Sequence, residues 1–288
     1  MKNVALYENG SKPEAFYWAE RVAEKLLALG FAVFVRQSLA SKLNTDLKNK
    51  TRTIGIQEFE RYADAVITLG GDGTVLSAAR ELLHTEIPIM GINIGKLGFL
   101  AEYPVEELDN ALDTFVNGNY RIIDRTAIYA EISGERIYAV NDFIIEKKST
   151  VRLIKIQAYT DDHFVADYRA DGLIITTPTG STAYSLSCNG PIIPPKANVI
   201  CLTPVAPHTL TLRPLILPDS SILTLSVNSP SGVAGLVSDG SLERLVKNGE
   251  IITIQKSDKC VKMIKPNDTS YFDLLRRKLF WAQNPVAD

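Results

Sequence analysis

Apolar and polar positions follow two different patterns along the chain, and the change comes near Gly118. Before it, short apolar runs with strand character alternate with segments whose apolar residues recur at helical spacing. The runs are Val4–Tyr7, Phe31–Val35, Ala65–Leu69 and Ile87–Asn93. The helical segments are one opened by Pro13 and closed by Gly30, then Val75–Leu83 and Pro104–Val116, while polar Ser38–Thr53 is expected to be a partly ordered loop with a variable helix. This alternation predicts an open, Rossmann-like α/β domain with a parallel sheet covered by helices.

After Gly118, helical spacing almost disappears and strand-length runs follow one another. They are Tyr120–Ile132, Arg136–Glu146, Leu153–Tyr159, Leu173–Thr176, Val199–Thr203, Ile222–Val227, Val233–Val237 and Ile251–Gln255. Turn-forming pairs such as Ser133-Gly134 and Asp161-Asp162 separate many of them, which is typical of a mostly antiparallel β domain. One helical exception is expected around Ser181–Ser187.

Near the C-terminus, Tyr271–Phe280 returns to helical spacing, with Ser270 as its N-cap. A lone helix after a β domain is expected to pack back onto the first domain. The sequence therefore predicts an α/β domain of residues 1–119, to which residues 268–288 return, and a β-rich domain of residues 120–267.

Composition and charge narrow the class of protein. The chain has 288 residues, of which 45% are hydrophobic and 22% charged, as in a globular protein with a full core. The net charge of −2 gives no reason to expect nucleic acid or a membrane surface as a partner. No run of about 18 apolar residues occurs, so we expect a cytoplasmic protein. The three cysteines have no C-x-x-C spacing and indicate neither a disulfide framework nor a zinc site.

The first candidate for chemistry is the loop Gly70–Thr74, which reads GGDGT and follows an apolar strand. Glycines let the backbone turn sharply and bring its N–H groups close to an anion, and a following helix adds its positive end. For a lone Gly-Asp-Gly, an ordinary tight turn is favoured roughly two to one. The preceding strand, the extra glycine and Thr74 weaken that alternative. Asp72 would repel a phosphate unless it handles a metal ion or a proton.

The second candidate is Asp171–Gly190, a segment rich in serine and threonine. Its hydroxyls could hold a polar ligand, although capping and turn chemistry would explain them equally well. A serine hydrolase is disfavoured because the chain has no G-x-S-x-G, and its three histidines have no triad context.

Two smaller candidates and the question of a metal remain. Asn141-Asp142 could bind a ribose diol, although a strand-end turn is the better explanation of that pair alone. Arg169 and Asp171 could form a surface ion pair or a charged clamp on a ligand. No group of histidines, cysteines and carboxylates has metal-ligand spacing, so any metal should be Mg²⁺ carried in with phosphate.

Taken together and in order, these motifs resemble the bacterial NAD kinases. They are GGDGT at Gly70–Thr74, GINIGKLGFL at Gly91–Leu100, Asn141-Asp142, YRADGLIITTPTGSTAYSLS at Tyr168–Ser187, PHTLTLRPLILP at Pro207–Pro218 and YFDLLRRKLFW at Tyr271–Trp281. GGDGT alone is shared with diacylglycerol and sphingosine kinases and, in related form, with phosphofructokinases. The Tyr168–Ser187 motif is much narrower and decides the resemblance.

The resemblance implies a phosphate-binding α/β domain, a dinucleotide-binding β domain, and a site between them where NAD meets a triphosphate. Asp72 matches the aspartate that acts on the 2′-hydroxyl of the adenosine ribose. The phosphate-donor loop would be Gly70, Gly71, Gly73 and Thr74. The NAD-binding positions would be Asp72, Gly73, Phe99, Asn141, Asp142, Arg169, Asp171, Thr182, Ala183, Tyr184, Ser185, Leu186 and Ser187.

Three positions depart from the family's commonest pattern or lie at its margin. Asp142 stands where the family more often has Glu, and Ser241 stands where it often has Gln. Arg152 occupies a position where a basic residue sometimes helps, across a subunit boundary.

The resemblance predicts the reaction ATP + NAD⁺ → ADP + NADP⁺, with Asp72 as general base, Mg²⁺ as the divalent metal and polyphosphate as a further possible donor. It also implies a homodimer or homotetramer. Two alternatives stay open at this point. A lipid or sugar kinase would share the GGDGT loop, and a non-catalytic sensor would bind NAD or NADP without turnover.

Overall fold

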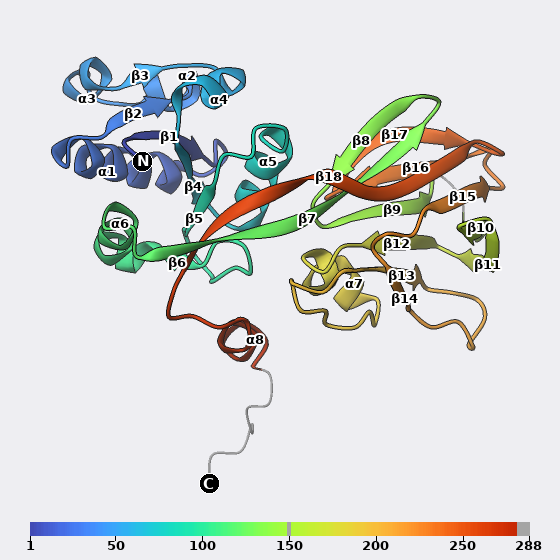
Figure 1. Cartoon of the computed structure of the whole chain (residues 1–288). Helices are drawn as coiled ribbons and strands as arrows, with labels where there is room; N and C mark the ends of the chain where they lie inside the picture. Colours follow the sequence, from blue (N-terminus) through green and yellow to red (C-terminus); the bar gives the residue numbers. More distant parts are fainter. Residues whose placement is uncertain (149–150, 281–288) are drawn as a thin grey trace, which may run out of the picture. The chain divides into compact units, whose positions relative to one another are not determined.

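The structure is a computed structural model that describes residues 1–148 and 151–280, and it divides into two compact units (Figure 1). Unit 1 contains Met1–Asp124 and the chain from Val261 onward, and unit 2 contains Arg125–Cys260. Both boundaries fall inside long strands, β7 (Tyr120–Ile132) and β18 (Ile251–Pro266). The sequence prediction placed them at the ends of these strands, because an apolar run does not show where along it the chain leaves one core for another.

Unit 1 is built on a parallel sheet in the order β18-β5-β4-β1-β2-β3. The strands are β1 (Asn3–Glu8), β2 (Ala32–Val35), β3 (Arg52–Thr53), β4 (Ala65–Gly70) and β5 (Ile89–Asn93). A short strand, β6 (Tyr103–Pro104), pairs with the end of β5. The strand order reverses between β1 and β4, which is the position where open α/β sheets bind ligands.

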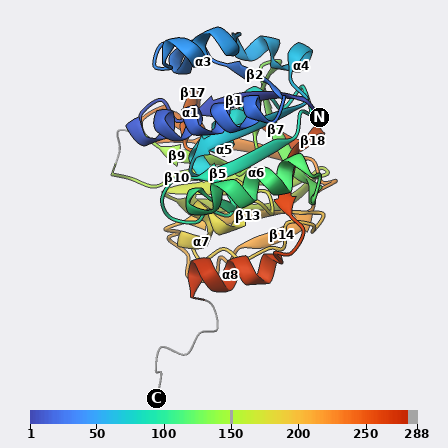
Figure 2. The same ribbon diagram turned by 90° about the vertical axis from the view of Figure 1, so that its left-hand side faces the viewer.

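Helices cover both faces of this sheet, which confirms the predicted α/β fold. α1 (Pro13–Ala28) and α6 (Leu108–Val116) share one apolar core with it, and α5 (Asp72–Glu81) packs on the opposite face (Figures 1 and 2). Gly30 ends α1 with a φ of 82°, as predicted for a residue just after a helix. The predicted helix Pro104–Val116 begins instead with a 3₁₀ turn, η2 (Val105–Glu107).

The stretch Ser38–Thr53 is more ordered than the sequence predicted. It contains the end of α2 (Gln37–Ala40), then α3 (Thr45–Lys50) and β3. The Asn44 side chain caps α3 by accepting from the Leu47 N–H, and Leu47 is buried. These helices are too short to show a helical period, which explains the error. Two more short elements follow, η1 (Ile56–Glu58) and α4 (Phe59–Tyr62).

The C-terminal helix α8 (Tyr271–Leu279) belongs to unit 1, as predicted. Ser270 caps it by accepting from the Asp273 N–H, and the Asp273 carboxylate accepts in return from the Ser270 N–H. Leu274 and Leu275 are buried. Trp281, the last residue of the closing motif, lies outside the described residues.

Unit 2 is an all-β fold of antiparallel pairs, which confirms the predicted class. One sheet has the order β14-β13-β12-β9-β16-β17; the other contains β11-β10-β15 and the first part of β18, together with β7 and β8. Their facing side chains form one apolar core. The strands are β8 (Glu135–Ala139), β9 (Asp142–Lys147), β10 (Ile154–Thr160), β11 (His163–Ala170), β12 (Gly172–Thr176), β13 (Val199–Val205), β14 (Leu215–Pro218), β15 (Leu223–Asn228), β16 (Val233–Ser238) and β17 (Ser241–Lys247).

Several elements of unit 2 differ from the predictions. The run Arg136–Glu146 is two strands, β8 and β9, separated at Val140-Asn141. Strands β11 and β17 were not predicted, because both are mostly exposed and polar residues interrupt their apolar positions. The predicted helix Ser181–Ser187 is a 3₁₀ turn, η3 (Gly180–Thr182), followed by a single short helix, α7 (Tyr184–Ser187), because Ala183 leaves the helical region with a ψ of −128°.

Candidate active site

The loop Gly70–Thr74 connects β4 to α5 and is a tight turn that requires glycine. A Cβ at Gly70 would lie 2.0 Å from Thr74 Oγ1, so only glycine lets Thr74 fold back over the strand end. The N–H groups of Thr74 and Val75 both donate to the Gly71 carbonyl, at 2.9 and 3.2 Å. The sequence predicted that the helix begins at Val75, but it begins at Asp72. Asp72 and Gly73 therefore stand in its first turn, at the positive end of the helix dipole.

Three backbone N–H groups hold the carboxylate of Asp72. The Phe99 N–H donates to Oδ2 at 2.8 Å, while those of Leu100 and Ala101 donate to Oδ1 at 2.9 and 3.0 Å. An ionised carboxylate has about four lone-pair positions, two on each oxygen. Both positions of Oδ1 are thus used, and Oδ2 keeps one for another donor.

Gly98 makes this contact possible. A Cβ at Gly98 would lie 1.8 Å from Asp72 Oδ1, so any side chain there would displace the carboxylate. The half-buried Phe99 ring beside it faces the ammonium of Lys278, which lies 5.5 Å from the ring centroid. Lys278 also donates to the Leu97 carbonyl, so α8 fixes the loop that carries Phe99, one of the predicted NAD-binding residues.

A cavity of about 310 Å³ opens in unit 1 beside the Gly70–Thr74 loop. It lies where the strand order reverses, because its lining comes from the end of β1 and the start of α5. The lining residues are Tyr7, Glu8, Asn9, Gly10, Arg36, Ser38, Gly73, Thr74 and Ser77. Asn9 Nδ2 donates to Thr74 Oγ1 at 3.2 Å, which ties the two sides together.

One wall of this cavity is a charged cluster that sequence reasoning missed. The Glu8 side chain is fully buried, and its Oε1 lies 3.0 Å from Arg36 Nη2 and accepts from the Ser38 hydroxyl. The Arg36 guanidinium also stacks 3.8 Å from the centroid of the Tyr7 ring. Burial and the neighbouring Glu81 carboxylate, to which its hydroxyl donates, raise the pKa of Tyr7 well above its usual range. A glutamate at the end of an apolar strand was the only signal in the sequence.

In unit 2, Asn141 and Asp142 lie at the start of β9, and the Asp239 carboxylate fixes their backbone. Asp239 accepts from the N–H groups of Val140, Asn141 and Asp142 at 2.9, 2.7 and 3.1 Å. The Asn141 carbonyl accepts from the Thr177 N–H at 2.9 Å. Asp239 lies far away in the sequence, on the turn after β16, and was not predicted.

The carboxyl group of Asp142 is unusual for its burial. The residue is only 4% exposed, and burial together with the Asp239 charge raises its pKa from 3.8 to about 7. A pKa that is shifted this far from its ordinary value is typical of residues in functional sites.

The segment Thr182–Ser187 divides into exposed and buried parts. Tyr184 is 43% exposed and Ser187 is exposed, while Thr182, Ala183 and Leu186 are half-buried. Ser185 is buried, and its hydroxyl is 2.8 Å from that of Thr203. The sequence predicted a helix around Ser181–Ser187, but α7 has only four residues. Its N-terminus therefore carries little of a helix dipole.

The charged residues around Tyr168 do not pair as the sequence suggested. Asp171 forms its ion pair with Lys147, at 2.6 Å. Arg169 is exposed and lines a cavity of about 600 Å³ in unit 2. Arg152, also predicted, and Lys155 line the same cavity, which is therefore rich in positive charge. Ser241 begins β17 and is exposed.

Metal-binding clusters and membrane-spanning helices are both absent from the part of the chain that the structure describes. Within residues 1–148 and 151–280, no group of three or more histidine, cysteine, aspartate or glutamate side chains could hold a metal ion. Across those same residues, no helix is both long enough and apolar enough to cross a membrane.

Comparisons with known proteins cover most of the chain and agree with one another. A family model of the ATP-NAD kinase N-terminal domain matches residues 4–120, and one of the ATP-NAD kinase C-terminal domain matches residues 140–266. The NAD kinase of Geotalea daltonii is 37% identical over 98% of this chain and 100% of that protein. The NAD kinase of Chlorobaculum tepidum is 42% identical over 80% of this chain and 82% of that protein. Among solved structures, yeast NADH kinase complexed with NADH covers 99% of this chain and 89% of its own, with 25% identity and a TM-score of 0.91.

Proposed function

The chain belongs to the NAD kinase family, and we propose that it phosphorylates the 2′-hydroxyl of the adenosine ribose of NAD, with ATP as donor and Asp72 as general base. The observation that carries this proposal is the position of the Asp72 carboxylate and the hydrogen bonds that it accepts. Three N–H groups hold it at the start of α5, beside the glycine loop, and leave one lone-pair position on Oδ2.

Asp72 supplies what a ribose hydroxyl lacks. The hydroxyl is a poor nucleophile, and a carboxylate within hydrogen-bond reach can orient it and accept its proton. In the proposed step, the 2′-oxygen forms a bond to the γ-phosphorus, and the bond from that phosphorus to the β,γ-bridging oxygen breaks. The bridging oxygen leaves on ADP, and the hydroxyl proton passes to Oδ2.

The glycine loop would serve the phosphates. The N–H groups of Asp72 and Gly73, in the first turn of α5, would present donors and a positive dipole to an anion. Phosphoryl transfer otherwise depends on alignment and charge neutralisation. We propose that Mg²⁺ arrives as part of the Mg·ATP substrate and neutralises phosphate charge there.

The residues of unit 2 would bind the dinucleotide. Asn141 offers an amide donor and acceptor, and Asp142 offers a carboxyl group, a combination that suits the hydroxyls of a ribose. The buried Asp142 carboxyl supports this role. Burying an ionisable group lowers the stability of the fold, and groups with such strongly shifted pKa values cluster at functional sites. The other residues that we propose to bind NAD are Arg152, Arg169, Asp171, Thr182–Ser187 and Ser241, together with Phe99 of unit 1.

A coupled assay for NADP formation tests the proposal, with NAD, Mg²⁺ and the donor varied across ATP, polyphosphate and other nucleotides. We expect turnover with ATP. Binding of NAD without formation of NADP from any donor would contradict the proposal and leave a sensor.

The assembly and location are part of the same proposal. We propose a homodimer or homotetramer in the cytoplasm, where the chain meets NAD and ATP. Size-exclusion chromatography with light scattering tests the assembly, and a monomeric mass at the assay concentration would contradict it.

A further inference from the structure

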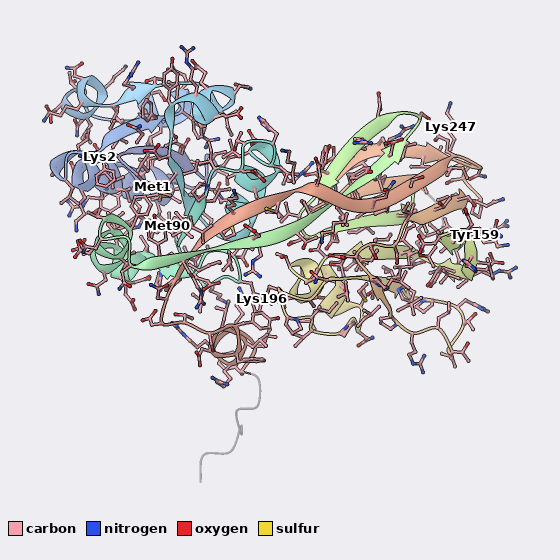
Figure 3. The ribbon with its side chains drawn as sticks, viewed as in Figure 1. Met1, Lys2, Met90, Tyr159, Lys196 and Lys247 are labelled. Atoms are coloured by element: carbon pink, nitrogen blue, oxygen red, sulfur yellow. The ribbon has the colours of Figure 1, made fainter. Side chains whose placement is uncertain are left out.

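A buried lysine lies behind the loop that holds Asp72. Lys265, near the end of β18, is 1% exposed. Its neighbour Ile264 pairs with Met90 of β5, which is labelled in Figure 3. The Lys265 ammonium donates to the Leu100 carbonyl at 2.7 Å, lies 3.4 Å from the Phe99 carbonyl, and pairs with Glu102 Oε1 at 2.7 Å. An ammonium has three N–H donors, and these three oxygens can take them.

The two carbonyls that Lys265 contacts belong to the same peptide groups that bind Asp72. The Phe99 carbonyl shares its peptide plane with the Leu100 N–H, and the Leu100 carbonyl shares its plane with the Ala101 N–H. Those two N–H groups donate to Asp72 Oδ1. Two peptide groups therefore join the ammonium on one side to the carboxylate on the other. Each polarises in the direction that strengthens both of its hydrogen bonds.

We infer that Lys265 is a positioning residue for Asp72, acting through the peptide groups 99–100 and 100–101. By fixing these groups it holds Oδ1 in the loop and directs the open position of Oδ2 toward the reacting hydroxyl. The inference rests on the proposed function of Asp72 as general base. Its kinetic importance follows from geometry, since a misplacement of about 1 Å in a reacting group can cost roughly 100-fold in rate.

Glu102 determines how the test must be designed. Its side chain is 9% exposed, so removing Lys265 alone would leave a buried carboxylate without its cation and could unfold the protein. The variant Lys265→Met/Glu102→Gln removes both charges together. Lys265→Gln/Glu102→Gln, which keeps an amide donor for the carbonyls, is a second variant should the first not fold. The control is Lys256→Met/Asp219→Asn, which removes an ion pair of unit 2 whose nitrogen and oxygen lie 2.5 Å apart.

Two measurements on the folded variant test the inference. For Lys265→Met/Glu102→Gln, we expect kcat to fall about tenfold or more while KM for NAD and ATP changes less than about threefold. Hydrogen–deuterium exchange without substrate should become faster in the peptide that contains residues 99–101 and stay unchanged in the control. The Gln/Gln variant should lie between wild type and the Met/Gln variant in both measurements. Unchanged exchange or unchanged kcat in both variants would overturn the inference.

A double-mutant cycle separates action through Asp72 from a general structural role. In the Asp72→Asn background, removing Lys265 and Glu102 should lower the residual rate by less than about threefold. A further loss of about tenfold would overturn the inference, because Lys265 would then act elsewhere. Wild-type turnover in Asp72→Asn alone would contradict the proposed function instead, and the exchange result would still show whether Lys265 orders the loop.

Discussion

The buried carboxyl of Asp142 makes a quantitative prediction about stability and pH. Its pKa is about 7 in the folded protein, against 3.8 for an ordinary aspartate, because burial and the Asp239 charge both oppose ionisation. A difference of about three pKa units corresponds to about 4 kcal/mol. At pH 8, folding must place an ionised carboxylate in the interior, so the wild-type protein bears this cost.

The direction of the pH dependence follows from the two pKa values. Well below pH 3.8 the carboxyl group is protonated in both the folded and the unfolded protein, so its ionisation does not change the free energy of unfolding. Between pH 3.8 and about 7 the unfolded chain ionises first, so stability falls as the pH rises, and above about 7 the cost is constant. Asp142→Asn removes the group. We expect the variant to be more stable than wild type by up to about 4 kcal/mol at pH 8, with the difference vanishing near pH 4.

Urea denaturation followed by circular dichroism between pH 4 and pH 8 checks this prediction. The control is Asp167→Asn, since Asp167 is exposed and its hydrogen bond from Lys155 lowers its pKa. That variant should show no gain in stability at high pH. A difference between Asp142→Asn and wild type that does not change with pH, or a loss of stability at pH 8, would refute the reasoning.

Two further predictions concern unit 1. Gly98→Ala should displace the Asp72 carboxylate, because the new Cβ would lie 1.8 Å from Oδ1, and we expect kcat to fall about 100-fold. The control is Gly55→Ala, since the atoms nearest its new Cβ would be the side-chain oxygens of Gln57 and Glu58, at 3.1 and 3.6 Å; this variant should keep wild-type kcat in the same assay. Glu8→Gln leaves the Arg36 guanidinium facing a neutral amide and should lower the free energy of unfolding by about 3 kcal/mol. Urea denaturation at pH 7 measures this loss, and an unchanged value would contradict the assigned ion pair.

Local patterns were enough to predict the fold class. Strands such as Val4–Tyr7 and Ala65–Leu69 are buried on both sides, so they appear in the sequence as uninterrupted apolar runs. Exposed elements gave no such signal. Strand β11 is at most partly buried along most of its length and the short helix α3 is polar, so neighbouring elements rather than their own periodicity determine their conformation.

The candidate site was predictable only where its residues are adjacent in the sequence. Asp72 and its glycines form one motif, so the loop could be singled out before the structure was known. The residues that fix the site come from distant positions. Asp239 holds the backbone of Asn141, and Lys265 holds the loop that binds Asp72, contacts that a single sequence without an alignment does not reveal.

The central claim is that Asp72 accepts the proton of the 2′-hydroxyl, and Asp72→Asn tests it most directly. The amide oxygen can still accept the N–H groups of Leu100 and Ala101, whereas the amide nitrogen replaces the oxygen that accepts from the Phe99 N–H, and the side chain cannot act as a base. Turnover should be measured as NADP formation with saturating NAD and Mg·ATP, beside NAD binding by calorimetry. We predict that kcat falls by a factor of about 100 to 10,000 while NAD binding and the circular dichroism spectrum stay close to wild type. A wild-type kcat in the folded variant would contradict the claim.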